Sequence, residues 1–227
     1  MARARPRPEL APAIKTFLNF DIMNKNFQFI SFEGIEGCGK STQAKKLYEY
    51  FLSKQIDCLL TREPGGSLAG EKIRGILLDE EIDKLSAKSE LLLNFAARIE
   101  HVEKIIKPAL KSGKIVICDR FVDSTFAYQG SAMGIAFEEI EKIQKIAIGE
   151  FMPDITFLIN VSVDEAFARI SARGNNNRYE KLGNEFHQKV YEGFFELAKK
   201  NSRIKIVDGT QNQQQVFQKI LNIINQN

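Results

Sequence analysis

Short apolar runs of four to seven residues recur along the chain between longer stretches with helical spacing. Five such runs lie at residues 27–32, 58–61, 115–118, 155–161 and 204–207. A short continuous apolar run bounded by turn residues is typical of a strand that is buried on both faces. We therefore predict five buried strands.

The stretches between these runs carry apolar residues every three or four positions, which predicts amphipathic helices. Helices are expected at about 41–52, 71–78, 89–110, 123–129, 138–148, 163–172 and 184–200, with a final amphipathic helix after the last strand. The apolar stripe of the long helix is expected to comprise Leu92, Phe95, Ala96, Ile99, Val102, Ile105 and Ile106.

Alternating strands and helices predict an α/β fold, a five-stranded parallel sheet with helices on both faces. Ligands bind such sheets at the carboxyl ends of the strands. The loops that begin at Gly34, Arg62, Asp119 and after Val207 all follow predicted strands. We therefore expect these loops to converge on one cleft.

Residues 34–41, Gly-Ile-Glu-Gly-Cys-Gly-Lys-Ser, match the phosphate-loop pattern G-x-x-x-x-G-K-[ST] between a predicted strand and a predicted helix. Its glycines let successive backbone N–H groups converge on phosphate oxygens, and the helix adds its positive N-terminal end. Lys40 is expected to reach the β- and γ-phosphates, and the Ser41 hydroxyl to ligate magnesium. The alternative is a glycine-rich turn that matches the pattern by chance. The order of strand, loop and helix argues against it.

Arginines are the second signal for chemistry. Arg62, Arg74, Arg98 and Arg120 lie near predicted strand ends or on helices that lead to the cleft, and Arg169, Arg173 and Arg178 cluster around an Asn/Gly-rich segment. Phosphoryl transfer between two anionic nucleotides requires cations around both of them. Any one of these arginines could be an ordinary solvated side chain, but the set favours phosphoryl transfer.

Asp119 ends an apolar strand, as expected of a carboxylate that helps to hold magnesium, although a turn cap is the alternative. Glu63–Pro64 could form a tight turn with a cis peptide bond, which the sequence alone does not establish. His101 and His187 have no nearby nucleophile at a recognisable spacing, so we predict that they are surface or packing residues.

Composition excludes several classes of protein. The chain has 227 residues and a net charge of +3, which is too small to indicate a nucleic-acid partner. Cys38, Cys58 and Cys118 lack C-x-x-C spacing, so we predict buried reduced thiols without zinc or disulfides in a cytoplasmic protein. No apolar stretch approaches the roughly 20 residues of a membrane-spanning helix.

Residues 1–26 differ from the rest, beginning with an Arg/Pro-rich segment and reaching Met23 just before the first strand. A disordered leader, a non-native extension or upstream start, a transit peptide and a basic patch are the alternatives, of which we favour the leader or extension. Residues 27–227 are predicted to form a single domain.

The chain from Phe29 onward resembles the bacterial thymidylate kinases, which phosphorylate dTMP to dTDP with ATP and magnesium. The resemblance is carried by the phosphate loop and by Thr61–Gly66 (Thr-Arg-Glu-Pro-Gly-Gly), Phe95–Arg98, Cys118–Phe121, Ala127–Gly130 (Ala-Tyr-Gln-Gly), Pro153–Asp154, Arg173–Gly174, Asn177–Arg178 and Asp208–Gln211. Many families share a phosphate loop, whereas Thr-Arg-Glu-Pro-Gly-Gly followed by Asp-Arg and Ala-Tyr-Gln-Gly is much more specific.

The resemblance implies a role for each matching residue. It implies that ATP is held by Gly34, Ile35, Glu36, Gly37, Cys38, Gly39, Lys40, Ser41 and Thr42, with Mg²⁺ at Ser41 and Asp119. It implies that dTMP is held by Glu36, Glu63, Pro64, Arg74, Asn94, Phe95, Arg98, Arg120, Thr125, Tyr128 and Gln129. Catalytic roles are implied for Lys40, Arg120, Asp119 and the lid arginines Arg173 and Arg178.

Within this set, Arg74 and Arg120 would clamp the acceptor phosphate, and Arg98 and Gln129 would bind the thymine edge. Tyr128 would lie near the sugar 2′ carbon and Glu36 near the 3′-hydroxyl. Some relatives carry an arginine in the phosphate loop where this chain has Gly37, so the lid arginines would supply the charge instead. The resemblance also implies a fold of the P-loop NTPase type with a lid segment, in a single nucleoside monophosphate kinase domain at 27–227 with the lid at about 172–184. The family is typically homodimeric.

One position departs from the family. The aromatic residue that stacks on thymine usually stands four residues before the arginine matched by Arg98, where this chain has Asn94. Phe95 is three residues before Arg98 and could still reach the base from nearly the same helix face. We favour Phe95 as the stacking residue; the alternative places Phe95 in the core and Asn94 at the base.

Other functions are weighed against this one. Another P-loop nucleotide kinase or a deoxynucleoside kinase is the main alternative, but a nucleoside kinase has no acceptor phosphate for Arg74 and Arg120 to bind. A P-loop switch or motor would need switch segments and a water-positioning residue, which we do not find. A protein that only binds nucleotide would leave the acceptor-side arginines without a task.

Overall fold

A computed structural model describes residues 27–82, 85–172, 178–179 and 181–226. The predicted leader, residues 1–26, and residues 173–177 and 180 of the predicted lid lie outside the described residues. The strands are β1 (Phe29–Glu33), β2 (Cys58–Arg62), β3 (Ile115–Asp119), β4 (Ile155–Asn160) and β5 (Ile204–Asp208).

The strands form one parallel sheet in the order β2-β3-β1-β4-β5. Asp119 at the end of β3 pairs in register with Phe32 of β1 and with Arg62 of β2. Three strands that are distant in the sequence therefore end side by side. The five predicted strands and their parallel arrangement are confirmed.

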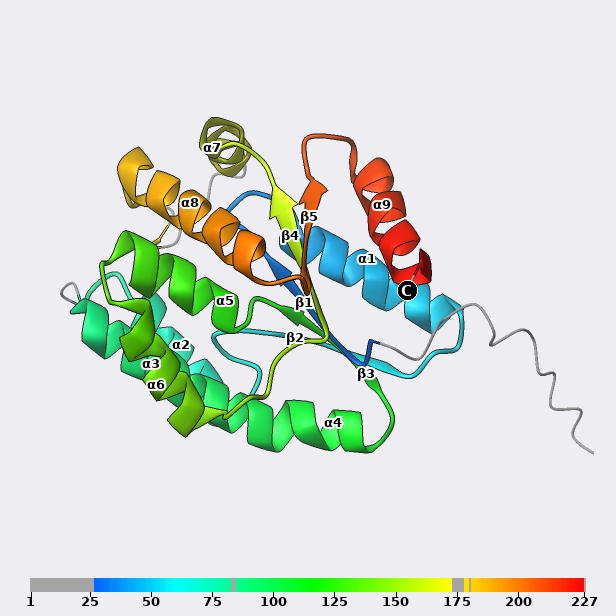
Figure 1. Cartoon of the computed structure of the whole chain (residues 1–227), viewed down its shortest axis with the longest axis horizontal. Coiled ribbons are helices and arrows are strands. Elements are labelled where there is room, and N and C mark those ends of the chain that lie inside the picture. The colour runs from blue at the N-terminus through cyan, green and yellow to red at the C-terminus, as the bar shows by residue number, and fades with distance from the viewer. Residues whose placement is uncertain (1–26, 83–84, 173–177, 180, 227) are drawn as a thin grey trace, which may run out of the picture.

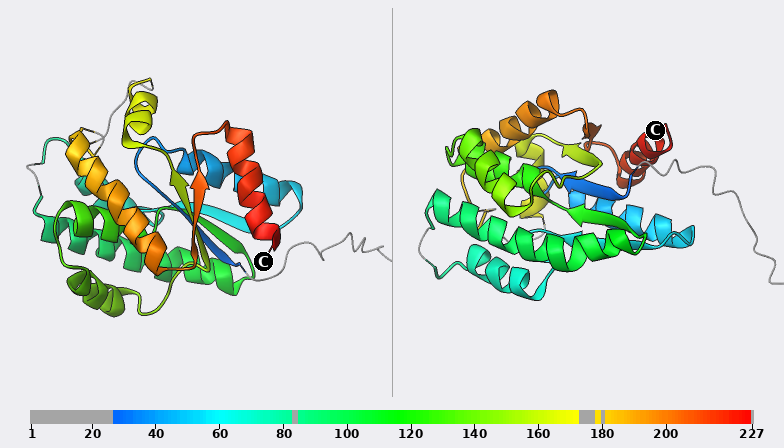
Figure 2. Two further views of the ribbon diagram at one scale, coloured as in Figure 1. Left: turned by 45° about the horizontal axis from the view of Figure 1, so that its top comes forward. Right: turned by 60° about the horizontal axis from the view of Figure 1, so that its bottom comes forward.

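Helices cover both faces of this sheet (Figure 1). One face carries α1 (Lys40–Ser53) and α9 (Gln213–Gln226). The rest of the described helical segments are α2 (Leu68–Leu78), α3 (Ala87–His101), η2 (Val102–Ile106), α4 (Lys107–Lys111), α5 (Val122–Thr125), η3 (Phe126–Ala132), α6 (Phe137–Ala147), α7 (Val163–Ser171) and α8 (Asn184–Lys200). Further views show the carboxyl ends of β4 and β5 beside α7 and the loop that leads to α9 (Figure 2).

Local sequence signals set several helix boundaries. The side chains of Ser67, Ser86 and Ser162 each accept a hydrogen bond from the backbone N–H three residues later, at 3.0, 3.1 and 3.3 Å. These serines are N-caps, which stabilise a helix start by satisfying one of its free donors. The predicted start of α2 at residue 71 is therefore three residues late, because the cap at Ser67 lies further upstream.

Two segments predicted as plain α-helix contain π-helical turns, η2 and η3. Such turns are often found at functional sites. The second one carries Tyr128 and Gln129, two of the predicted substrate-binding residues. The wider turn thus positions residues of the expected acceptor site.

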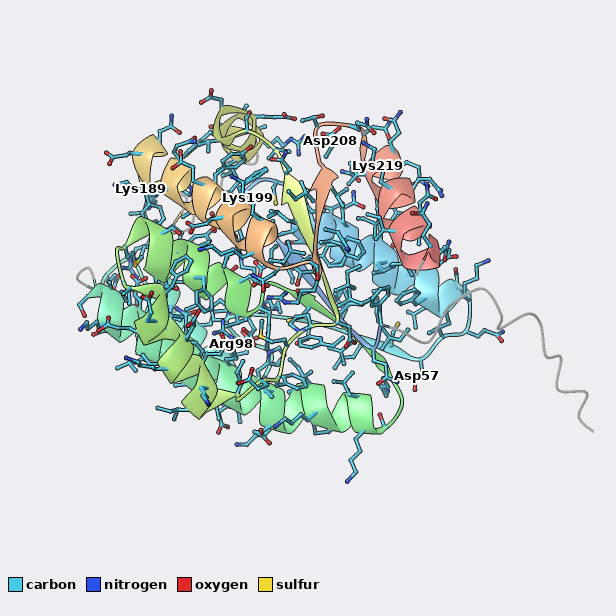
Figure 3. The ribbon with its side chains drawn as sticks, viewed as in Figure 1. Asp57, Arg98, Lys189, Lys199, Asp208 and Lys219 are labelled. Carbon is cyan, nitrogen blue, oxygen red and sulfur yellow. The ribbon has the colours of Figure 1, made fainter. Side chains whose placement is uncertain are left out.

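The core lies between the sheet and both helical layers, and its largest members include Phe29, Phe32, Phe51 and Phe157. Charged side chains such as Lys189 and Lys199 are exposed on the outer face of α8, whereas Arg98 lies inside the molecule (Figure 3). Because Arg98 is only 2 % exposed, its charge needs partners within the fold.

The predicted apolar stripe of α3 is partly wrong. Leu92, Ala96 and Ile99 are exposed, while Arg98 and His101 are buried on the inner side of the helix. The helix directs polar residues towards the ligand cleft, so its buried face does not follow hydrophobicity alone. Some of its apolar residues are left on an outer face instead.

Candidate active site

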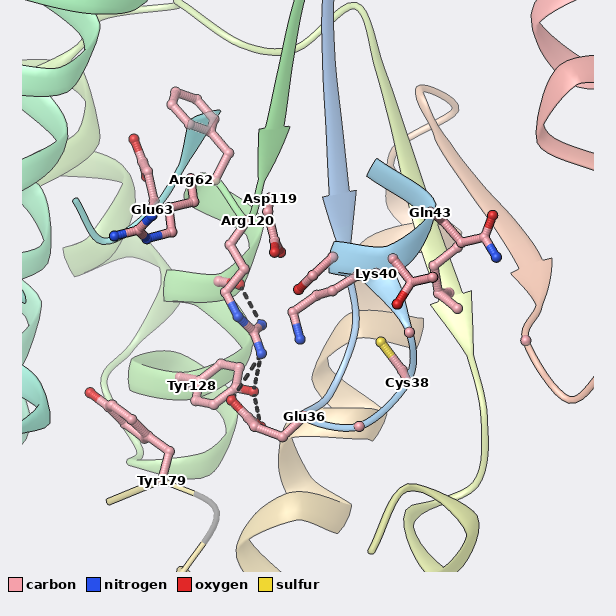
Figure 4. A pocket seen from close by; sticks show the side chains of 18 of the residues that line it. Glu36, Cys38, Lys40, Gln43, Arg62, Glu63, Asp119, Arg120, Tyr128 and Tyr179 are labelled. Carbon is pink, nitrogen blue, oxygen red and sulfur yellow. Dashed lines mark hydrogen bonds and ion pairs between the residues drawn. The ribbon is translucent and has the colours of Figure 1, made fainter. Parts of the chain in front are cut away.

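A cleft of about 840 Å³ lies at the carboxyl ends of the strands (Figure 4). Its wall includes residues from the loop after β1, the β2–α2 turn, the end of β3, η3 and the loop after β5. The expected convergence of these loops is confirmed. The predicted residues that line it are Glu36, Gly37, Cys38, Gly39, Lys40, Ser41, Thr42, Glu63, Pro64, Arg74, Asn94, Arg98, Asp119, Arg120, Thr125, Tyr128 and Gln129.

The phosphate loop needs its glycines for conformation and for close packing. Gly34, Gly37 and Gly39 have φ values of 138°, 76° and 98°, a region that side chains strongly disfavour. A Cβ atom on Gly37 would lie 2.5 Å from the backbone oxygen of Ala166 in α7. An arginine at this position, as in some relatives, would therefore not fit against α7 in this arrangement.

The N-terminus of α1 is an open anion site. Its N-cap is Gly39, no side chain caps the helix, and its first turn has no acidic residue. The first N–H groups of a helix lack intrahelical acceptors and carry a partial positive charge. The loop and helix start therefore present donors and Lys40 to the same part of the cleft.

Gly34 and Ile35 do not line the cleft but support it from behind. The Gly34 carbonyl accepts a hydrogen bond from Arg120 Nη1 at 2.9 Å, and the Ile35 carbonyl accepts one from Lys40 Nζ at 3.2 Å. Through these contacts, the loop backbone positions the two cations.

The residues predicted to hold magnesium fit that task. Ser41 and Asp119 both line the cleft, and Asp119 Oδ1 is buried without a hydrogen-bond partner among the described residues. A buried carboxylate oxygen left unpaired is costly, so an additional partner is expected for it. Mg²⁺ in phosphoryl-transfer sites uses few protein ligands besides phosphate oxygens and water. In the described ranges, no group of three or more Asp, Glu, His and Cys residues is arranged to hold a metal ion.

Arg120 is the most heavily bonded side chain of the cleft. Its Nη1 donates to Gly34 O and Ser124 Oγ, and its Nη2 donates to Glu36 Oε1 at 2.9 Å and Tyr128 Oη at 3.1 Å. Burial opposes its charge, but Tyr128 and Glu36 raise the pKa of Arg120 above its ordinary value. Its backbone has φ of 71°, an unusual conformation that often marks functional sites.

Arg74 and Arg62 add positive charge beside Arg120. Arg74 Nη1 donates to the Pro64 carbonyl at 2.8 Å. Burial and the neighbouring cations, first Arg62 and more weakly Arg120, lower the pKa of Arg74. Cations that repel one another in this way are stabilised by a bound anion. This part of the cleft is therefore suited to a phosphate group.

Arg98 is held from behind by the turn after β2, whose Glu63–Pro64 bond is cis. Its Nε donates to Glu63 Oε2 at 2.7 Å, and the other Glu63 oxygen lies 3.0 Å from His101 Nδ1. Arg98 Nη1 is buried with no hydrogen-bond partner among the described residues. Because Arg98 lines the cleft, this free donor is available to a ligand.

Both histidines are buried, which corrects the surface half of our expectation. His101 also lies 2.6 Å from Thr61 Oγ1 through its Nε2. His187 Nδ1 lies 3.6 Å from Glu36 Oε2, and its Nε2 lies 3.0 Å from the Tyr179 carbonyl oxygen. Their role in the structure is to support acidic residues of the cleft.

Glu36 and Tyr128 form one wall of the cleft. Tyr128 Oη donates to Glu36 Oε2 at 2.5 Å. Burial alone would raise the pKa of Glu36, but Arg120 and Lys40 outweigh it and lower that pKa. Glu36 is therefore a carboxylate that can accept a hydrogen bond from a ligand hydroxyl.

The structure corrects the preference for Phe95 over Asn94. Phe95 is 2 % exposed, belongs to the hydrophobic core and does not line the cleft, whereas Asn94 does. The Arg98 guanidinium lies over the Phe95 ring, with Cζ 4.9 Å from its centroid. Phe95 thus supports Arg98 from within the core instead of facing the base.

Arg178, a predicted catalytic residue, does not line the cleft and contacts α2 and α3 instead. Its Nη2 donates to Glu90 Oε1 at 2.6 Å, and its Nη1 donates to the Leu77 carbonyl at 3.1 Å. In this conformation it forms no hydrogen bond with the phosphate loop. A role in ATP binding would require it to lie there. Arg173, the other predicted lid arginine, lies outside the described residues.

Sequence reasoning missed several residues of the site. Arg169 bridges two loops by donating to the carbonyls of Cys38 and Gly209, at 3.3 and 2.9 Å. Gln43, Gly209, Gln211, Asn212, Gln213 and Val216 complete that end of the cleft. The Asp-Gly-Thr-Gln motif at 208–211 was the available signal for the loop, and Arg169 belonged to the arginine cluster singled out in the sequence but was not assigned to the site.

Comparisons with known proteins find relatives over most of the chain. The thymidylate kinase family model matches residues 32–220. The chain is 41 % identical to the thymidylate kinase of Finegoldia magna over 196 residues, covering 86 % of this chain and 97 % of the relative. It is 44 % identical to that of Mycoplasma capricolum over 199 residues, covering 86 % of this chain and 93 % of the relative.

A solved structure is similar over nearly the same extent. The crystal structure of thymidylate kinase from Ehrlichia chaffeensis superposes with a TM-score of 0.71 at 38 % sequence identity. The match covers 87 % of this chain and 98 % of that chain.

Proposed function

The chain belongs to the thymidylate kinase family; it transfers the γ-phosphoryl group of ATP to dTMP, giving dTDP and ADP, and we propose that it does so with the residues of the cleft described above. Phosphoryl transfer requires no protein nucleophile, and positioning and charge stabilisation dominate its catalysis. The described cleft has cations and oriented hydrogen-bond donors that can position the substrates and stabilise charge.

Residues 34–42 bind the ATP phosphates in this proposal. The open N-terminus of α1 and the loop N–H groups supply donors, and Lys40 supplies a charge that follows the transferred group. Arg169 and the loop 209–213 line the adjoining end of the cleft, which leaves them to contact the adenosine part of ATP.

Mg²⁺ is proposed to be held by the Ser41 hydroxyl and by Asp119, directly or through water. When bound, it neutralises charge on the β- and γ-phosphates. The unpaired Asp119 Oδ1 supports this assignment.

The acceptor phosphate is assigned to Arg74 and Arg120, with Arg62 adding charge nearby. Glu36 and Tyr128 face the sugar: Glu36 accepts a hydrogen bond from the 3′-hydroxyl, and the Tyr128 ring limits space at the 2′ carbon. Arg98, Gln129, Thr125 and Asn94 surround the base, and Glu63 holds Arg98 in place.

The observation that carries the proposal is one cleft with a phosphate loop at one end and the cations Arg74 and Arg120 at the other. The test measures nucleoside diphosphate formation from ATP and Mg²⁺ with a panel of monophosphates. We expect dTMP to be preferred over dCMP, dGMP and AMP. Equal turnover of AMP and dTMP would contradict the specificity for dTMP. ATP hydrolysis that does not depend on an acceptor would contradict phosphoryl transfer to a nucleoside monophosphate.

We further propose a cytoplasmic homodimer consisting of one catalytic domain at 27–227 with a lid at about 172–184. The buried free thiols of Cys38, Cys58 and Cys118 are compatible with a reducing compartment. No described helix is long and apolar enough to cross a membrane. The exposed apolar face of α3 is available for a second copy of the chain.

A further inference from the structure

Glu90 is a buried acidic residue to which neither the family resemblance nor the motifs assign a role. It lies in the first turn of α3, and its side chain is 1 % exposed. Buried carboxylates are costly unless they are paired and hydrogen-bonded. Its partners therefore indicate why the fold retains it.

Three donors converge on this carboxylate. Arg178 Nη2 lies 2.6 Å from Oε1, while Tyr179 Oη and Gln129 Nε2 lie 3.0 and 3.3 Å from Oε2. A carboxylate paired with a guanidinium only accepts hydrogen bonds. The group facing it from Gln129 must therefore be the amide NH₂.

This constraint determines the orientation of the Gln129 amide. An amide carries its donor and acceptor on opposite branches, so with Nε2 on Glu90 the carbonyl Oε1 is directed elsewhere. Gln129 lines the cleft, and no hydrogen bond within the described part of the chain engages Oε1. The cleft thus receives an acceptor from Gln129 and, from Arg98 Nη1, a donor.

A donor beside an acceptor matches one type of base edge. Thymine and uracil present the O4 acceptor beside the N3–H donor, whereas cytosine presents the N4 donor beside the unprotonated N3 acceptor. If Gln129 Oε1 faced cytosine N3, two acceptors would meet. Two buried acceptors that cannot form a hydrogen bond weaken binding. If the Gln129 amide were rotated, its NH₂ would donate a hydrogen bond to cytosine N3 instead.

We propose that Glu90 is a positioning residue that selects the thymine edge over the cytosine edge by fixing the orientation of the Gln129 amide. The inference rests on the proposed function, in which Gln129 and Arg98 bind the base of the acceptor. Glu90 itself acts through Gln129.

The test compares Glu90→Gln with the wild-type enzyme. A neutral amide at position 90 can accept or donate, so either orientation of Gln129 becomes possible. We expect the ratio of kcat/KM for dTMP to that for dCMP to fall about tenfold, the factor that one net hydrogen bond represents. The change should lie mainly in KM, and Arg98 should preserve some preference for dTMP.

Two internal controls separate positioning from general damage. The ratio for dTMP and dUMP should be unchanged in Glu90→Gln, because both bases present O4 and N3–H. Tyr179→Phe removes another donor from the same carboxylate and should change turnover of dTMP and dCMP by the same factor. If the variant only weakened the packing of the lid, kcat/KM would fall by the same factor for every substrate.

Each outcome bears on the inference separately from the proposed function. Wild-type enzyme without preference for dTMP over dCMP would overturn the proposed function itself. A folded Glu90→Gln enzyme with the wild-type ratio would overturn only the inference. If thermal melting shows that this variant is unfolded, Glu90→Asp, which keeps the charge for Arg178 but retracts it from Gln129, should lower the ratio; an unchanged ratio overturns the inference.

Discussion

At the residue scale, Lys40 and Arg120 differ in what they contact, although both are cations of one cleft. Lys40 belongs to the phosphate loop and contacts the Ile35 carbonyl, whereas Arg120 is bound to Glu36 and Tyr128. We propose that the first side chain binds the donor phosphates and the second the acceptor phosphate. Their removal should therefore have different kinetic consequences.

We predict that Lys40→Ala lowers kcat by about 10²–10³, the usual cost of removing one group that stabilises transition-state charge. Arg120→Ala should also raise KM for dTMP and weaken its binding in calorimetry. Lys45→Ala is a matched control, because Lys45 lies on the same helix with an exposed side chain. Normal dTMP affinity in Arg120→Ala would refute the acceptor role.

Glu33, immediately before the phosphate loop, is a second residue with a measurable signature. Its carboxyl accepts hydrogen bonds from Phe121 N at 2.7 Å and Ser124 Oγ at 2.6 Å. Burial and the nearby Asp123 raise the pKa of Glu33 from 4.5 to about 7, against the opposing effect of Arg120. The folded protein therefore holds a proton that the unfolded chain releases near pH 4.5.

This shift predicts a pH-dependent contribution to stability. Because the folded pKa is raised, the contribution is fully present below pH 4.5 and is lost as pH rises through about 7. Glu33→Gln should remove this dependence. The melting temperature of the variant relative to that of the wild type should therefore rise as pH is raised from 5 to 7.5. Glu185→Gln, at an exposed site on α8, is the control. Parallel melting curves for Glu33→Gln and wild type would contradict the shift.

Most residues that the motifs singled out line the cleft, but the directions of their side chains were harder to predict. The choice between Asn94 and Phe95 was wrong because both precede Arg98 by about one helical turn, at four and three residues, and the spacing alone did not separate them. The structure separates them by burying the Phe95 ring under Arg98. Glu90 and Glu33 gave no sequence signal, since a buried carboxylate is recognised only by the donors around it.

At the scale of elements, buried strands were predicted well because a parallel sheet makes continuous apolar runs. Helix boundaries and the inner face of α3 were predicted less well. Leu92 and Ile99 matched an apolar period, but tertiary contacts turned Arg98 and His101 inward. The π-helical turns η2 and η3 also have no periodic signal that a sequence reading could detect.

In the part of the predicted lid that the structure describes, Arg178 has contacts that its predicted role did not anticipate. Arg178 contacts Glu90 and the Leu77 carbonyl, so this arginine is coupled to the acceptor side. We predict that Arg178→Ala raises KM for dTMP, while Arg173→Ala slows the chemical step. The double variant should lose at least about 10²-fold in single-turnover rate, since arginines at P-loop transition states contribute about 10³–10⁵.

Lys181→Ala is the matched lid control, because its ion pair with Glu80 is half exposed and contributes little. Single-turnover kinetics under saturating dTMP and ATP isolate the chemical step from binding. A double variant with a near-normal rate would show that neither lid arginine supplies charge to the transition state.

At the scale of the whole molecule, α3 connects the cleft to the outer surface. Its inner side carries Glu90, Arg98 and His101, and its outer side carries Leu92, Ala96 and Ile99 at spacings of four and three residues. Ile76 of the neighbouring α2 is also 42 % exposed. A contiguous exposed apolar face is typical of a protein interface. In an obligate dimer this face would be buried against its own copy.

We predict that the chain forms a homodimer through this face of α3 and that Leu92→Lys weakens it. Leu92 is 57 % exposed, and a lysine there would bring two charges into a symmetric contact, which is costly when desolvated. Leu52→Lys is the matched control, because Leu52 is 47 % exposed on α1 at the other side of the molecule (Figure 1). Light scattering coupled to gel filtration should give a monomer mass for Leu92→Lys and a dimer mass for the wild type and Leu52→Lys. A wild-type monomer would contradict the dimer, and a dimeric Leu92→Lys would place the interface elsewhere.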